Sequence, residues 1–268
     1  MKKRLFIIFC LFSFLVFPIN TKAEEAPDSM RQEIFKEWDL ITSFMEAEYS
    51  DLFENKSEIK ECDVSNGLRY STLNLYLLID NEIKNLEELK IKNDKKEFLF
   101  YTKYNDKGII LIEMYEEKGV YSFGAIGGKA NAFKDAIDLM SRLTKEDEFN
   151  LYRISVYDYL LTYVNDGVEY VIPFSHGDKL IEDYYQVQNI AQLPTVEDFL
   201  KQQKEKMVEI KEEIEQFQKL HPNEVMYGID YHINLLPKKE NNIFVYGFLV
   251  ASAVLFIVVV FKKDKAKA

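Results

Sequence analysis

The side chains that could carry out chemistry are few and lie far apart in the sequence. Cys62 and His176 could supply a thiol nucleophile and its base, but neither stands in a segment typical of cysteine hydrolases. The three histidines lack the H-E-x-x-H spacing of zinc hydrolases, and no G-x-S-x-G, P-loop or G-x-G-x-x-G motif occurs. We therefore expect no cofactor and no metal ion, assign no catalytic residue, and favour a binding protein over an enzyme.

Two glycine-containing segments are the next candidates for a site. Gly124, Gly127 and Gly128 precede a predicted helix, whose first amide groups could hold an anion. A tight turn into the helix is the simpler interpretation of these glycines. The polar segment 175–178 contains His176 and follows a predicted strand, so it forms either the rim of a site or an ordinary loop.

Tyrosine is the most distinctive residue of this chain, which has 17 of them. Its large ring and polar tip suit the binding of peptides or glycans. Candidates for such a binding face crowd into one predicted hairpin and the turn after it: Tyr157, Tyr159, Tyr163, Tyr170 and His176. The alternative is a half-buried sheet, because strands favour aromatic residues in any case.

The elements that would position these residues predict an α+β fold with an antiparallel sheet. Apolar alternation predicts strands at 72–79, 97–104, 109–115, 120–126, 152–164 and 168–174, and a late strand at 225–235. Asn, Asp and Gly cluster in hairpin turns at 105–108, 117–119 and 165–167. The strand 152–164 changes phase near Val156, which suggests a bulge. A helix over 132–143 completes the order β-β-β-α-β-β.

Amphipathic helices are predicted to flank this sheet. Residues 29–52 carry apolar side chains at intervals of three and four, and Ser29 fits the first position of a capping box. A second helix, 195–220, begins with Thr195 and Asp198 as capping residues. Its apolar residues fall on two heptad positions over about three heptads. It therefore either packs across the sheet or forms a homodimer.

The N-terminus has the pattern of a cleaved signal peptide. Residues 1–23 comprise a basic start, an uncharged and mostly apolar run of 13 residues, and small residues before Glu24. The apolar run is shorter than the roughly 20 residues that span a bilayer. We therefore expect export of the chain, with an uncleaved anchor as the alternative.

The C-terminus has the pattern of a membrane anchor. The run from Ile243 to Phe261 is 19 residues long and uncharged, which is enough for one transmembrane helix. Lys262 and Lys263 begin a basic tail, 262–268, which the positive-inside rule places in the cytoplasm. The body of the chain would then lie outside the cell membrane.

A short element precedes the predicted span: Leu236-Pro237-Lys238-Lys239-Glu240. The order of an LPxxx element, an apolar span and a basic tail resembles the cell-wall sorting signals of Gram-positive surface proteins, over the last 33 residues. The resemblance implies a Gram-positive host and attachment to the wall. That family has Thr and then Gly at the cleaved bond, where this chain has Lys239 and Glu240, so we favour a retained membrane anchor.

Net charge limits the partners of the exported body. The whole chain has 34 Lys and Arg against 45 Asp and Glu, a net charge of −11, whereas residues 24–261 alone carry −18. Such a body lacks the clustered cations that bind nucleic acid, and its field favours cationic protein or peptide partners. We therefore predict a membrane-anchored extracytoplasmic binding protein with 24–242 as its domain. An envelope hydrolase and a dimerising structural subunit are the alternatives.

Overall fold

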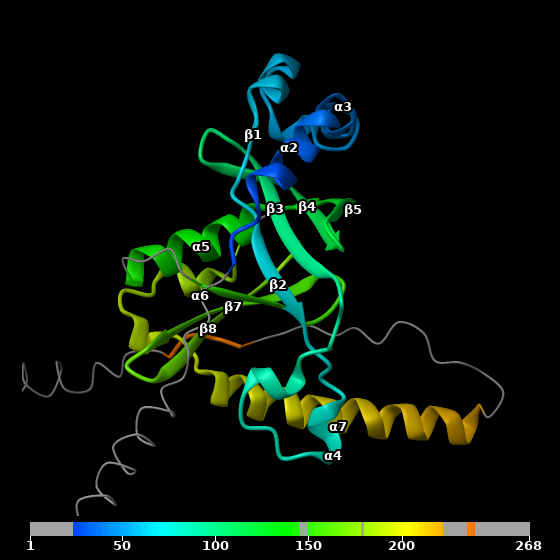
Figure 1. The fold of residues 1–268 in the computed structure, drawn as a ribbon. Coiled ribbons are helices and arrows are strands. Elements are labelled where there is room, and N and C mark those ends of the chain that lie inside the picture. Colours follow the sequence, from blue (N-terminus) through cyan, green and yellow to red (C-terminus); the bar gives the residue numbers. More distant parts are fainter. Residues whose placement is uncertain (1–23, 145–148, 178–179, 222–234, 239–268) are drawn as a thin grey trace, which may run out of the picture.

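The computed structural model describes residues 24–144, 149–177, 180–221 and 235–238 (Figure 1). The fold is α+β, with a mostly antiparallel sheet of eight strands and helices on both of its faces. The predicted α+β class is thereby confirmed for the described body of the chain, but the sheet is not wholly antiparallel as predicted, because β2 (Leu68–Thr72) and β6 (Asn150–Arg153) pair in parallel.

The predicted meander forms the first half of the sheet. Its strands are β3 (Lys96–Tyr104), β4 (Lys107–Glu117) and β5 (Val120–Lys129). Two-residue turns join them, Asn105-Asp106 and Lys118-Gly119, and all four residues have the positive φ that such hairpins need. The sequence predicts Gly108 as a turn residue, but it lies within β4, where a Cβ atom would come within 2.6 Å of the carbonyl oxygen of Ala130.

The second half of the sheet contains three strands where the sequence predicts two. They are β6 (Asn150–Arg153), β7 (Asp158–Asn165) and β8 (Val168–Ser175). The predicted long strand with a bulge is wrong, because the chain reverses over residues 154–157 and β6 pairs antiparallel with β7. The N–H groups of Ile154 and Ser155 both donate to the carbonyl oxygen of Asp158, which closes this reversal.

An early strand joins the two halves. β1 (Asp63–Val64) and β2 (Leu68–Thr72) pair antiparallel with β3, and β2 also pairs in parallel with β6. The resulting order is β5-β4-β3-β2-β6-β7-β8, with β1 paired to β3 outside this path.

The predicted strand 72–79 is wrong. Ladder pairing ends at Thr72, and residues Leu77–Asp80 form the short helix α4. The side chain of Asn74 accepts a hydrogen bond from the N–H of Tyr76 at 3.2 Å, which turns the backbone before the helix. Three apolar residues of the segment are buried together in one cluster: Leu73, Leu75 and Leu78. In a strand, Leu78 would point to the face opposite that of Leu73 and Leu75.

Two N-terminal helices cover one face of the first half of the sheet. They are α2 (Asp28–Lys36) and α3 (Trp38–Glu48), followed by the 3₁₀ turns η1 (Ser50–Leu52) and η2 (Lys56–Glu61). The single predicted helix is therefore divided at Glu37. Its apolar stripe is buried against the sheet, with Met30, Ile34, Ile41 and Met45 fully inaccessible.

The predicted capping box at Ser29 is wrong. The N-cap is Pro27, without a side-chain cap, and the Ser29 hydroxyl instead hydrogen-bonds with the hydroxyl of Tyr121 at 2.8 Å.

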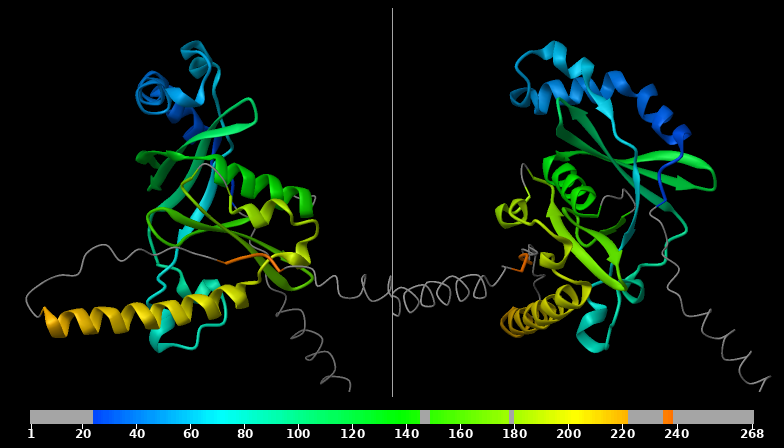
Figure 2. Two further views of the ribbon diagram at one scale, coloured as in Figure 1. Left: turned by 180° about the vertical axis from the view of Figure 1, so that it is seen from behind. Right: turned by 90° about the vertical axis from the view of Figure 1, so that its left-hand side faces the viewer.

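The helix α5 (Asn131–Thr144) lies on the opposite face, between the two halves of the twisted sheet (Figure 2). It matches the helix predicted over 132–143. Its buried side chains join a cluster with residues from both halves of the sheet, including Leu111 of β4 and Leu161 of β7. This helix therefore packs against both halves of the sheet.

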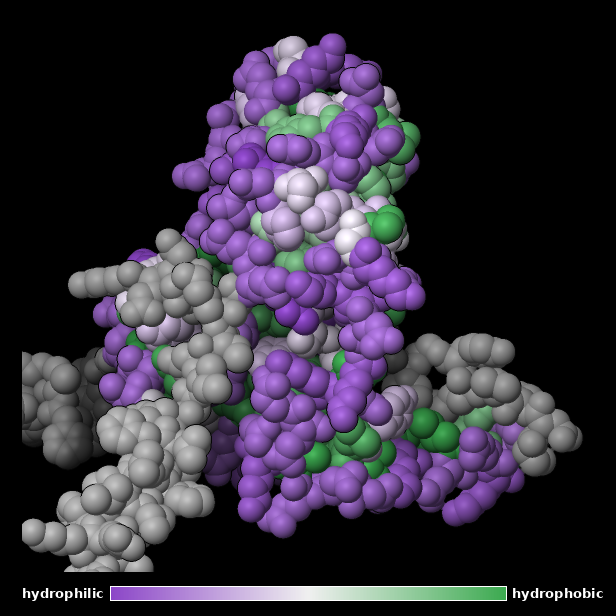
Figure 3. All heavy atoms as spheres, viewed as in Figure 1, coloured by the Kyte–Doolittle hydropathy of each residue, from purple (hydrophilic) through white to green (hydrophobic). Residues whose placement is uncertain are grey.

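The helix α7 (Val196–Leu220) begins with the predicted capping box of Thr195 and Asp198. Its first half packs against β8, α4 and η3 (Leu86–Leu89) through buried residues: Val196, Phe199, Leu200, Gln203, Met207 and Ile210. Its second half extends beyond the body (Figures 1 and 2). Apolar side chains appear on the surface along α7, and Leu220 near its end is 77% exposed (Figure 3).

The last described segment returns to the body beside α6 (Glu182–Tyr185) and η4 (Ile190–Gln192). Leu235 is buried, and its carbonyl oxygen accepts a hydrogen bond from the Tyr184 hydroxyl at 2.9 Å. Lys238 donates its N–H to the carbonyl oxygen of Gln192 at 2.6 Å and pairs with Asp198 at 3.0 Å.

Several predicted segments lie outside the described residues. These are the signal peptide 1–23, the late strand 225–235 except for its last residue, the span from Ile243 to Phe261, and the tail that begins with Lys262 and Lys263. Within the described ranges, none of the helices is long and apolar enough to cross a bilayer.

Candidate functional site

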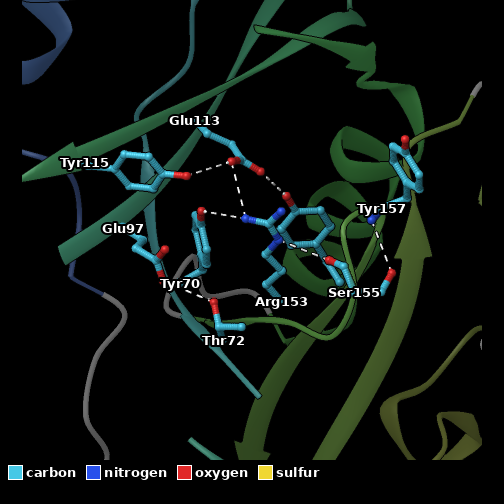
Figure 4. Close-up of polar contacts among 9 residues, drawn as sticks. Tyr70, Thr72, Glu97, Glu113, Tyr115, Arg153, Ser155 and Tyr157 are labelled. Atoms are coloured by element: carbon cyan, nitrogen blue, oxygen red, sulfur yellow. Dashed lines mark hydrogen bonds and ion pairs between the residues drawn. The ribbon is translucent and has the colours of Figure 1, made fainter. Parts of the chain in front are cut away.

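The candidate site is a cluster of polar side chains at the junction of the two halves of the sheet (Figure 4). Alternation along the strands places them on the same face as α5, beyond the part that α5 covers. We name it the Glu113 cluster; its members are Tyr70, Thr72, Glu97, Glu113, Tyr115, Arg153 and Tyr159.

Glu113 is the buried centre of this cluster. It is 5% exposed, although it stands within an otherwise apolar stretch of β4. The hydroxyl of Tyr159 donates to Oε1 at 2.8 Å, and that of Tyr115 donates to Oε2 at 3.3 Å. Nη1 of Arg153 lies 3.4 Å from Oε2. Both carboxylate oxygens are therefore partnered, as a buried charge requires.

Arg153 is held between the buried centre and the surface. Its Nε donates to the carbonyl oxygen of Ser155 at 3.1 Å, and its Nη1 contacts the Tyr70 hydroxyl at 3.5 Å as well as Glu113. Its side chain is still 20% exposed. Burial disfavours its charge, but the field of Tyr159 and Glu113 outweighs burial and raises the pKa of Arg153.

The tyrosines of the cluster act as donors. Burial, together with the negative charge of Glu113, raises the pKa of Tyr70, Tyr115 and Tyr159 above the ordinary range. They therefore keep their protons at neutral pH and are unsuited to act as bases.

Glu97 is the second carboxylate of the cluster. It faces Tyr115 across the β3–β4 pair, and the Thr72 hydroxyl donates to it at 3.1 Å. Burial raises the pKa of Glu97 despite this hydrogen bond and the nearby Arg153. The two carboxylates thus share one face of the sheet in different environments.

The loop between β6 and β7 forms one rim of the cluster. Asp158 is 3% exposed and accepts hydrogen bonds from the hydroxyls of Ser155, at 2.6 Å, and of Ser175. These bonds fix the loop, whose tip exposes Val156 and Tyr157 to 60% and 64%.

His176 lies against this rim. Its ring stacks on Tyr159, with centroids 5.5 Å apart and planes inclined by 16°, and meets the edge of Tyr157 at 5.7 Å. Its Nε2 is buried without a hydrogen-bond partner among the described residues. Burial lowers the pKa of His176, so the neutral ring is favoured.

The glycines of β5 make room for this arrangement. A Cβ at Gly124 would come within 2.4 Å of the Tyr115 ring, and one at Gly128 would come within 2.6 Å of His176 Nδ1. Gly127 and Gly128 have positive φ where the pairing of β4 and β5 shifts register. The two predicted roles, an anion site at the helix start and a simple turn into the helix, do not describe these glycines, since they lie within β5.

The structure divides the predicted tyrosine face. Tyr157, Tyr159 and His176 lie together at the rim, but Tyr159 is fully buried. Tyr163 and Tyr170 face each other across β7 and β8, half-buried toward the α5 side.

The structure does not bring Cys62 and His176 together. Cys62 belongs to the cluster beneath α2 and α3, on the face of the sheet away from His176. Burial and the charge of Glu61 raise the pKa of Cys62 to about 11, so the thiolate is disfavoured. In the described part of the chain, no three His, Cys, Asp or Glu side chains converge to hold a metal ion.

The Glu113 cluster itself was not predicted from the sequence. The available signal was Glu113, a single charge that interrupts the apolar run of 109–114. Comparison of the chain with known protein families, with curated proteins and with solved structures gives no match. The proposals below rest on the residues themselves.

Proposed function

We propose that this chain is a membrane-anchored, extracytoplasmic binding protein of a Gram-positive bacterial envelope, with the Glu113 cluster as its ligand site. The observation that carries the proposal is that this cluster has a buried layer and a partly exposed layer. Glu113, Tyr70 and Tyr159 are buried and hold Arg153 in place, whereas the Arg153 side chain remains partly exposed. A guanidinium fixed in this way loses little conformational entropy when a ligand binds.

The exposed layer defines the chemistry of the ligand. Arg153, Tyr115, Thr72 and Glu97 are all partly exposed and together offer donors and acceptors of hydrogen bonds. A peptide or glycan segment with polar groups of both kinds would suit them. The body charge of −18 favours a ligand with net positive charge.

Matched basic and acidic peptides, titrated into purified 24–242, test this proposal. We expect the basic peptides to bind more tightly at low salt and the difference to shrink as salt is added. Glu97→Gln should weaken binding, whereas Glu116→Gln, on the neighbouring strand, should not. Equal binding of both peptides at low salt would refute the preference for cationic ligands.

A membrane anchor is proposed from the uncharged run between Ile243 and Phe261, with Lys262 and Lys263 on its cytoplasmic side. Flotation of the full chain with liposomes tests anchoring, and protection of the tail from protease in intact cells tests orientation.

An envelope hydrolase is the second candidate, favoured by the two carboxylates. Burial raises the pKa of Glu97, whereas Glu113 accepts from two tyrosines and contacts Arg153. Carboxylates in contrasting environments can divide the roles of acid and base between them. Release of reducing ends from cell-wall glycan strands, abolished by Glu97→Gln, would support this function. No release by the unaltered chain would exclude it for that substrate.

A further inference from the structure

We propose that the chain rests on the outer leaflet through one defined surface, the η4 face, which we define as Gln188–Gln192 together with Leu236–Lys238. This inference rests on the proposed membrane anchor. It names the lipid headgroup surface as the partner of the η4 face.

The first observation is the attachment of the segment that leads to the predicted span. Lys238 is joined to the body twice, by its N–H to the carbonyl oxygen of Gln192 and by its ammonium group to Asp198. The same oxygen of Asp198 accepts hydrogen bonds from the N–H and the hydroxyl of Thr195, each at 2.9 Å. Burial of Leu235 adds an apolar contact. The point at which the chain leaves the body is therefore fixed.

The second observation is the length of chain that remains. Five peptide steps separate Lys238 from Ile243, and at about 3.6 Å each they reach no more than about 18 Å. The headgroup region occupies roughly 5–8 Å of that length on one side of the bilayer. The η4 face must then lie within roughly 13 Å of the headgroup surface, too near for the body to turn another side to the membrane.

The third observation is the charge of the same surface. Tyr184 to Val196 is a run of 13 residues without a charged side chain, in a chain of which 29% of residues are charged. Gln188, Asn189 and Ala191 of this run are exposed, and Leu236 beside it is 45% exposed. An anionic lipid headgroup surface repels the acidic parts of the body but not an uncharged run such as this one.

Energy transfer to lipid tests this orientation in the full chain. In a background with Cys10→Ala and Cys62→Ala, a donor dye is placed at Ala191→Cys on the η4 face or at Asp51→Cys in η1, and the protein is reconstituted into liposomes with acceptor-labelled headgroups. Both positions are exposed, so neither label disturbs the core. The segment that contains η1 lies with α2 and α3 at one end of the molecule, whereas the segment that leads into α7 lies toward the other end (Figures 1 and 2).

We expect greater transfer from Ala191→Cys than from Asp51→Cys. Insertion of a flexible Gly/Ser segment between Lys239 and Glu240 should abolish that difference while the protein still floats with the liposomes. Equal transfer from both positions in floating, uninserted protein would overturn the orientation and leave the anchor intact. Failure to float would overturn the anchor itself, and this inference with it.

Discussion

A single buried carboxylate, Glu113, organises the polar cluster at the junction of the two halves of the sheet. Moving a charge from water into the protein interior costs several kcal/mol unless it is paired and hydrogen-bonded. Here two tyrosine hydroxyls and one guanidinium meet that requirement. These contacts fix the orientation of Tyr115, Tyr159 and Arg153, which is the property expected of a preorganised binding site.

Removal of Arg153 should reveal how much the fold depends on this pair. Arg153→Met leaves the Glu113 charge with only its two tyrosine donors, so we expect the free energy of unfolding to fall by about 2–4 kcal/mol. Urea denaturation of 24–242, followed by Trp38 fluorescence, measures the change. Lys95→Met removes the exposed ion pair with Glu117 and should cost less than about 1 kcal/mol. Equal losses in both variants would show that Glu113 does not need Arg153.

His176 should make the protein less stable as the pH falls. Because burial lowers the pKa of His176 in the folded chain, the unfolded chain takes up a proton first, near its ordinary pKa of about 6.5. The free energy of unfolding should therefore decline below that pH, by no more than about 1.4 kcal/mol per pH unit from this group.

His176→Gln isolates this effect, because the carboxylates that titrate in the same range are present in both proteins. The pH slope should be smaller in this variant, whereas Tyr157→Leu should keep the slope of the unaltered chain. An identical slope in all three proteins would contradict the assigned role of His176.

At the scale of elements, the sequence predicts correctly those helices and strands that depend only on short-range patterns. The meander, α5 and α7 follow from apolar spacing, turn residues and the Thr195 capping box. The segment after Thr72 was mistaken for a strand because Leu73, Leu75 and Leu78 are buried by contacts with α7, which spacing along the chain does not reveal. The reversal at 154–157 was missed for a similar reason, since β6 is defined by its pairing with the distant β2.

The packing of β5 on β4 depends on Gly124, which lies close to the ring of Tyr115. Gly124→Ala would force the Tyr115 ring to move, because the added Cβ would lie 2.4 Å from it. We expect a loss of about 1–3 kcal/mol of stability and weaker ligand binding, since the Tyr115 bond to Glu113 is disturbed. Ser122→Ala, at an exposed position of the same strand, should change neither quantity. Normal stability and binding in Gly124→Ala would show that Tyr115 can shift freely.

At the scale of the whole molecule, a dimer through 195–220 would need apolar residues of α7 that already pack within the same chain. The α7 seam is packed within the same chain as far as the half-buried Ile214, so only Phe217, Leu220 and the exposed part of Ile214 remain for a partner. This length is below the three heptads that a stable coiled coil needs. We expect 24–242 to sediment as a monomer.

A dimer in the same sedimentation experiment would point to the distal end of α7. In that event Ile214→Glu should dissociate it, whereas Glu213→Lys, an exposed change on the same helix, should not.

The candidate site could not be predicted from the sequence, because its residues come from five strands whose order depends on long-range pairing.

The parallel pairing of β2 with β6 has a consequence for how the chain folds. β2 emerges early, yet its partner lies about 80 positions later, and so distant a contact forms slowly. Until β6 has been synthesised, the first half of the sheet is therefore complete except along one side of β2, whose unpaired N–H and C=O groups can pair with any other strand. Arrival of β6 both closes that edge and creates the junction at which Arg153 meets Glu113. A chain interrupted before Asn150 should self-associate through this edge rather than persist as a smaller stable domain.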